Sequence, residues 1–149
     1  MTGSSQINVT RENSIGVANF GTFTQTGGTI DVSGKDSIGI YAKDSSSSTT
    51  ITGSTVNAKN GAVAFYADSS SGNESTITLN TVTSNIGDGG LLFFNYTGTL
   101  PGQVGKFNIS GPTTVNILSG GVAFYNRGII GSEATFLNMI NGNNLTLNM

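Results

Sequence analysis

The stretch IDVSGKDSIGI at residues 30–40 repeats INVTRENSIGV at residues 7–17 position by position, with no gap. A second pair of segments matches in the same way: residues 56–66 correspond to residues 115–125, with VNA aligned to VNI and GAVAFY aligned to GGVAFY. Repetition at a spacing of a few tens of residues is typical of solenoids, in which each unit forms one coil. The chain is therefore expected to be a repeat protein.

The repeated unit predicts three short strands separated by Gly, Asn and Ser turns. Apolar residues alternate with small or polar ones, as expected for strands with one buried face, and no segment keeps a helical period over three turns. A unit of this size cannot bury its inner face alone, so neighbouring units must stack. The sequence predicts an all-β fold, a single-stranded parallel β-helix of about five coils, with residues 1–149 as one domain. One strand recurs at spacings of 23 to 33 residues, at Ile7, Ile30, Val56, Val82, Val115 and Leu145.

The composition excludes several classes of function. Charged residues make up 9% of the chain, the net charge is −2 and hydrophobic residues make up 36%, which fits neither charge-driven disorder nor a nucleic-acid-binding surface. Cys and His are absent, so disulfides and thiolate metal sites are impossible and the usual general base is missing. We expect no enzymatic activity and no cofactor. The chain has no apolar run as long as a membrane span and its first residues do not resemble a signal peptide, so we expect it to be a segment of a longer protein.

Side-chain alternation predicts which residues face the core. If Ile38 and Ile40 point inward, Gly39 and Tyr41 point outward. The same register assigns an inward position to Ile15, Val17, Val63, Phe65, Leu91, Phe93, Val122 and Phe124. It also predicts an outer aromatic row, formed by Tyr41, Tyr66, Phe94 and Tyr125. This row either stabilises the coils beneath a neighbouring loop or offers an exposed strip for a ligand.

Four loops are expected to leave the solenoid at the same point of successive coils, directly after the aromatic strand of each coil. They span residues 43–49, 68–75, 95–106 and 126–133. Loops on a rigid scaffold are where binding functions concentrate. The third is the longest and contains Tyr96, Leu100 and Pro101, which we take as candidate partner-contact residues. An equally good alternative is that this loop folds back over the outer aromatic row.

Two further patterns have simpler explanations. Asp44 and Asp68 follow aromatic strands at similar distances and could share a calcium ion, but two carboxylates are few ligands, so we interpret both as solvated turn residues. The Thr-rich segments at residues 50–52 and 76–78 suggest an ice-binding array. The variable coil length argues against the flat lattice that such an array needs.

Residues 13–17 and 35–43, which read NSIGV and KDSIGIYAK, resemble the passenger repeats of the large fusobacterial autotransporter adhesins. The resemblance is clearest over residues 7–66 and looser at residues 121–125. It implies a long right-handed β-helix that is exported through a C-terminal barrel to the bacterial cell surface. It also implies adhesion to a protein or glycan on host cells or other bacteria. We expect the segment to be monomeric.

Two alternatives remain open from the sequence. The first is a β-helical carbohydrate-active enzyme or phage tailspike fragment, which would need clustered acidic and basic residues. Arg11 and Arg127 lie at opposite ends of the chain, and no acidic trio shares a coil face. The second alternative is a spacer segment that binds nothing.

Overall fold

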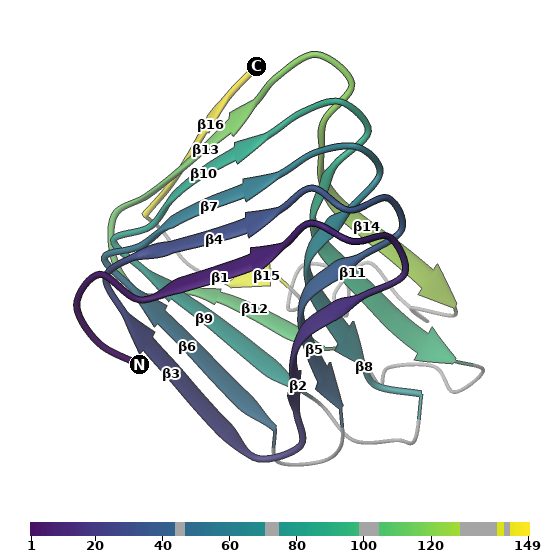
Figure 1. The fold of residues 1–149 in the computed structure, drawn as a ribbon. Coiled ribbons are helices and arrows are strands. Elements are labelled where there is room, and N and C mark those ends of the chain that lie inside the picture. Colours follow the sequence, from purple (N-terminus) through teal and green to yellow (C-terminus); the bar gives the residue numbers. More distant parts are fainter. Residues whose placement is uncertain (44–46, 71–74, 99–104, 129–139, 142–143) are drawn as a thin grey trace.

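The computed structural model describes the whole chain except residues 44–46, 71–74, 99–104, 129–139 and 142–143. Every regular element in this part of the chain is a β-strand. The chain winds repeatedly through three parallel sheets, which form the three sides of a solenoid (Figure 1). The expected all-β parallel solenoid is confirmed.

We number the sheets in the order in which each coil passes through them. Sheet 1 contains β1 (Gln6–Val9), β4 (Thr29–Val32), β7 (Thr55–Ala58), β10 (Thr83–Ile86), β13 (Thr113–Ile117) and β16 (Leu145–Asn148). Sheet 2 contains β2 (Ile15–Asn19), β5 (Ile38–Lys43), β8 (Val63–Asp68), β11 (Leu91–Gly98) and β14 (Val122–Gly128). Sheet 3 contains β3 (Thr22–Thr26), β6 (Ser48–Thr52), β9 (Thr76–Asn80), β12 (Lys106–Ile109) and β15 (Ile140–Asn141). The described strands thus make five complete coils and the first strand of a sixth.

The pairing in sheet 1 gives the length of each coil. Equivalent residues on successive strands lie 23, 26, 28, 31 and 32 residues apart. The added length falls mainly between sheets 2 and 3, where the connecting segment grows from residues 20–21 in the first coil to residues 129–139 in the fifth. The strands themselves stay in register, because the extra residues lie outside them.

Two of the expected repeat positions are wrong by two residues. Val56 pairs with Ser84 rather than Val82, and Val115 pairs with Leu147 rather than Leu145. Ser84 is fully buried, so a polar side chain occupies an inward position that the apolar pattern assigned to Val82. Because alternation has a period of two, a shift of two residues preserves the pattern and cannot be detected from it.

The interior is a continuous apolar core to which all three sheets contribute. Its largest fully buried apolar side chains are Phe65, Phe93, Phe107, Ile30, Ile40, Ile51, Ile77, Leu79, Ile86 and Leu92. Phe107 of sheet 3 contacts aromatic rings of sheet 2, with its centroid 4.7 Å from that of Phe93, 5.4 Å from Phe124 and 6.4 Å from Phe65. The rings join two sides of the solenoid.

The predicted inward register of sheet 2 is wrong at the beginning of each strand. Ile15 is 50% exposed and Val122 is 43% exposed, and Ile38, Val63 and Leu91 are only half-buried. The second residue of each strand points inward instead. A Cβ on Gly39 would lie 2.8 Å from Val32 Cγ2 in sheet 1, and Ala64 and Leu92 at the equivalent position are fully buried.

Two consecutive residues therefore face the core in this sheet, because Ile40, Phe65 and Phe93 follow these positions and are also buried. The ladder between β5 and β8 omits Gly39 and Ala64 and resumes at Ile40 and Phe65. An irregularity of this kind resets the alternation, so the later part of each strand agrees with the predicted faces.

The turns between sheets 1 and 2 form a second stack beside the strands. Asn13, Asp36, Asn60 and Asp88 have positive φ angles in these turns. Asn and Asp tolerate this left-handed conformation better than other residues with a side chain. The turns of successive coils are joined by backbone hydrogen bonds, such as those from Gly61 N to Asp88 O and from Asn13 N to Lys35 O.

Candidate functional site

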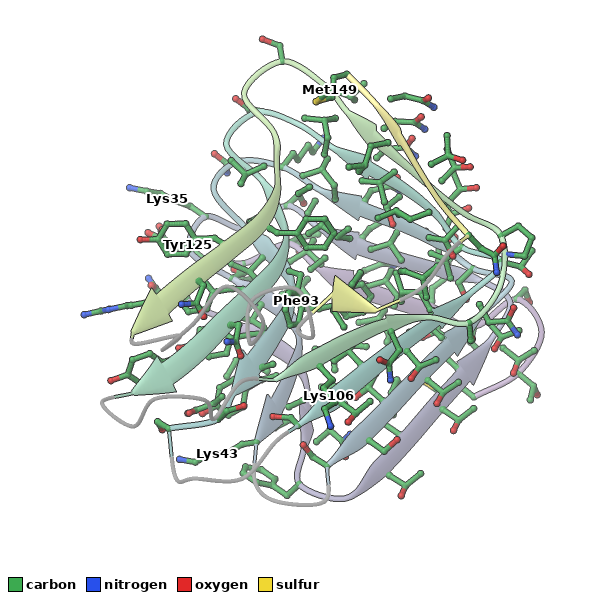
Figure 2. The ribbon with its side chains drawn as sticks, turned by 180° about the vertical axis from the view of Figure 1, so that it is seen from behind. Lys35, Lys43, Phe93, Lys106, Tyr125 and Met149 are labelled. Atoms are coloured by element: carbon green, nitrogen blue, oxygen red, sulfur yellow. The ribbon has the colours of Figure 1, made fainter. Side chains whose placement is uncertain are left out.

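The outer aromatic row forms a continuous stack on the outside of sheet 2. Tyr41, Tyr66, Phe94 and Tyr125 are in register on successive strands. Their neighbouring ring centroids are 5.2, 4.5 and 5.3 Å apart. The first three rings are half-buried and Tyr125 is 51% exposed. Figure 2 shows Tyr125 on the outside of the sheet and Phe93 inside the solenoid.

A charged column runs beside the outer aromatic row, two residues farther along each strand. It consists of Lys43, Asp68, Tyr96 and Arg127, which pair in register. Lys43 Nζ lies 3.9 Å from Asp68 Oδ2, and the Arg127 guanidinium carbon lies 5.8 Å from the centre of the Tyr96 ring. Tyr96 was expected in a loop, but it belongs to β11 and lies half-buried in this column.

Asp68 connects the aromatic row to the charged column. Its carboxylate accepts a hydrogen bond of 2.6 Å from Tyr41 Oη, one of 3.0 Å from the backbone N–H of Ser70, and one from Ser70 Oγ. Burial alone raises the pKa of Asp68, but the hydrogen bonds from Ser70 and Tyr41 and the charge of Lys43 outweigh it and lower the pKa. Asp68 is therefore a buried, partnered carboxylate rather than the solvated turn residue we expected.

Burial also acts on Tyr66 in the middle of the outer aromatic row. Desolvation raises the pKa of Tyr66, and the negative charge of Asp68 raises it further, while Arg127 acts in the opposite direction. The hydroxyl group of Tyr66 thus stays protonated and can donate a hydrogen bond.

Asn95 holds the base of the longest loop that we expected to contact a partner. Its side chain is fully buried in the middle of β11. Oδ1 accepts a 2.8 Å hydrogen bond from the backbone N–H of Gly105, and Nδ2 donates a 2.7 Å bond to Asn126 Oδ1. Because Gly105 immediately precedes β12, Asn95 fixes the point at which the chain re-enters the solenoid. The pattern of the sequence did not predict this role of Asn95.

A ladder of amide side chains crosses the outer face of sheet 1 and was also missed. Asn85 Nδ2 donates to Asn57 Oδ1 at 2.9 Å, and Asn116 Nδ2 donates to Asn85 Oδ1 at 2.8 Å. The ladder continues to Asn148 at one end and ends on Asp31 at the other. A Thr-X-Asn pattern in β7, β10, β13 and β16 is the sequence signal that could have revealed it.

The threonine columns of sheet 3 stay in register despite the variable coil length. Thr24, Thr50 and Thr78 lie side by side on three strands. The argument that variable coil length prevents a regular threonine array was therefore wrong. The next strand places Lys106 beside Thr76 and Asn108 beside Thr78, which interrupts the array after three strands.

Several predicted features lie outside the described residues. These are Leu100, Pro101, Asp44 and the central residues of all four expected loops. In the part of the chain that is described, no three acidic side chains come together as metal ligands. No helix there has the length and apolar character needed to cross a bilayer.

No protein-family model, curated protein or solved structure matches this chain.

Proposed function

We propose that this chain is an adhesive segment of the secreted passenger of a bacterial surface autotransporter, and that it binds a protein or glycan on a host cell or on another bacterium. The observation that carries the proposal is the outer aromatic row with the charged column beside it. The resemblance of residues 35–43 to fusobacterial passenger repeats supports the bacterial cell surface as the location.

The composition of this surface suits partner recognition. Tyr and Arg are enriched at protein interfaces, because each offers a large contact area together with hydrogen-bonding groups. Tyr125 and Arg127 lie exposed on one strand, next to the half-buried Phe94 and Tyr96 of the neighbouring strand. The ring stacking and the hydrogen bonds to Asp68 hold the surface in one conformation, which lowers the entropic cost of binding.

The solenoid supplies a rigid support for this contact. Each strand of sheet 2 is hydrogen-bonded to its neighbour in the sheet, and aromatic contacts in the core connect sheet 2 to sheet 3. The backbone groups of the strands are occupied by this pairing, so recognition falls to outward side chains and to loops. The proposed contact surface uses side chains alone and can be tested without altering any loop.

The test is binding of the fluorescently labelled chain to cultured epithelial cells and to other bacteria, measured by flow cytometry. Tyr125→Ala and Arg127→Ser are each expected to lower binding at least tenfold. Thr24→Ala is the control, because Thr24 is exposed on sheet 3 and does not belong to the contact surface on sheet 2. Equal binding by all variants would contradict the proposed surface. Absence of binding by the parent chain would favour a spacer.

A further inference from the structure

A groove runs along the outside of the solenoid where sheet 1 meets its turns. It has a volume of about 530 Å³ and includes Asp31, Asn57, Asn85, Lys59, Asp88 and Leu118 in its lining. Asp31, Asn57 and Asn85 point outward from successive strands of sheet 1. Lys59, Asp88 and Leu118 belong to the stacked turns that follow the strands of this sheet (Figure 1). The groove therefore crosses several coils in the direction of the solenoid axis.

The amide ladder gives the groove a repeating set of hydrogen-bonding groups. An Asn side chain has two N–H donors and an oxygen with two lone pairs. Asn57 and Asn85 each use one donor and one lone pair within the ladder. Each keeps a second donor and a second lone pair. These groups recur at the spacing of neighbouring strands, about 4.8 Å.

The wall formed by the turns supplies apolar and charged groups. Leu118 is 56% exposed, and Lys59 and Asp88 lie on the same side. Among the residues that the structure describes, Lys59 forms no ion pair with Asp31 or Asp88. A groove with both charge signs and an apolar wall favours a neutral ligand with many hydroxyl groups over a strongly charged one.

We propose that this groove binds an unbranched neutral glycan that lies along the solenoid axis, with one sugar unit on each strand. A pyranose ring is about as long as the strand spacing of about 4.8 Å, so successive units meet equivalent amides. An extended peptide repeats every 3.3 Å or, on one face, about every 6.6 Å, and matches this spacing poorly. The groove lies on sheet 1, so the inference does not depend on the contact surface proposed for sheet 2.

The experiment is isothermal titration calorimetry of the chain with cello-oligosaccharides and chito-oligosaccharides of one to six units. Affinity is expected to rise by roughly threefold or more per unit up to three units and then to level off, because each unit adds contacts with one strand. Leu118→Glu is expected to lower affinity at least tenfold by placing a charge on the wall. Ile15→Glu is the matched control, because Ile15 is 50% exposed on sheet 2.

Asn85→Ala provides a second variant, which removes the middle amide of the groove and is expected to lower affinity about tenfold. Thermal melting of each variant confirms that the fold is retained. Absence of binding to either sugar series, or binding that does not change with chain length or with Leu118→Glu, overturns the proposal. Tetra-alanine serves as the extended-peptide probe, and equal binding of this peptide in the groove also overturns it.

Discussion

Replacing Phe107 by Ala tests the aromatic core that joins sheets 2 and 3. Removing a buried Phe side chain costs about 3–5 kcal/mol of unfolding free energy. Phe107 is fully buried and contacts the rings of Phe65, Phe93 and Phe124, each of which adds about 0.5–1.5 kcal/mol beyond burial. Because these contributions overlap, we expect a loss of about 4–5 kcal/mol for Phe107→Ala.

Two other variants calibrate this magnitude. Phe124 is half-buried at the edge of the same cluster, so Phe124→Ala is expected to cost about 2 kcal/mol. Phe20 is 60% exposed, and Phe20→Ala is expected to change the stability by less than about 0.5 kcal/mol.

The assay is urea unfolding followed by far-ultraviolet circular dichroism. The m-value must be compared between variants, because repeat proteins can unfold in parts when the coupling between coils is weakened. If Phe107→Ala is no more destabilising than Phe20→Ala at equal m-values, the assigned aromatic core is wrong.

Three further changes probe other parts of the solenoid. Gly39→Ala is expected to cost about 1–3 kcal/mol, because its Cβ would lie 2.7 Å from a backbone oxygen, whereas Gly21→Ala has no atom within 4 Å and serves as the control in the same urea assay. Asp68 has a lowered pKa in the folded state, so it stabilises the fold above its unfolded pKa of about 3.9 and loses this contribution as the pH falls through the folded value. Asp68→Asn should therefore flatten the decrease in unfolding free energy between pH 6 and pH 3, and a variant that retains the parent's pH dependence would contradict this assignment. Asn95→Ala is expected to cost about 1–3 kcal/mol by leaving the buried N–H of Gly105 without its acceptor, and hydrogen exchange at this amide should accelerate.

The sequence predicted the solenoid and the outer aromatic row because both depend on exact repetition. Tyr41, Tyr66 and Tyr125 occupy equivalent positions in three recognisable copies of one motif, and Phe94 keeps the aromatic character where the rest of the motif has diverged. A column of identical chemistry follows directly from parallel, in-register stacking. No knowledge of loops or of local backbone irregularities was needed.

The sequence failed where one backbone irregularity changes which face a residue joins. Alternation alone gives Ile38 and Ile40 the same face, yet only Ile40 is fully buried. Nothing in the alternation identifies Gly39 as an inward residue, since that depends on how closely Val32 of sheet 1 approaches. Distances between sheets are a property of the folded molecule and have no direct signal in the pattern of one strand.

The amide ladder and the role of Asn95 were missed for a different reason. Asn is common in turns, so its presence at regular positions within strands was hidden by its abundance elsewhere in the chain. A search for the Thr-X-Asn pattern would have separated the Asn residues that lie in strands from those that lie in turns. The residues of the charged column vary in chemistry from coil to coil, so repetition gives no indication of them.

The alignment of hydrogen bonds between coils has a mechanical consequence. The ladders of all three sheets run along the stack, so tension applied along the solenoid axis acts on the hydrogen bonds between coils, and a terminal coil, which is bonded on one side only, can detach first. A coil of 23 to 32 residues that detaches and straightens releases roughly 80 to 110 Å of chain. The molecule can therefore lengthen in discrete steps under load while the remaining coils stay folded. If the chain serves as the surface adhesin segment proposed above, a sudden pull would be dissipated through successive small ruptures between coils.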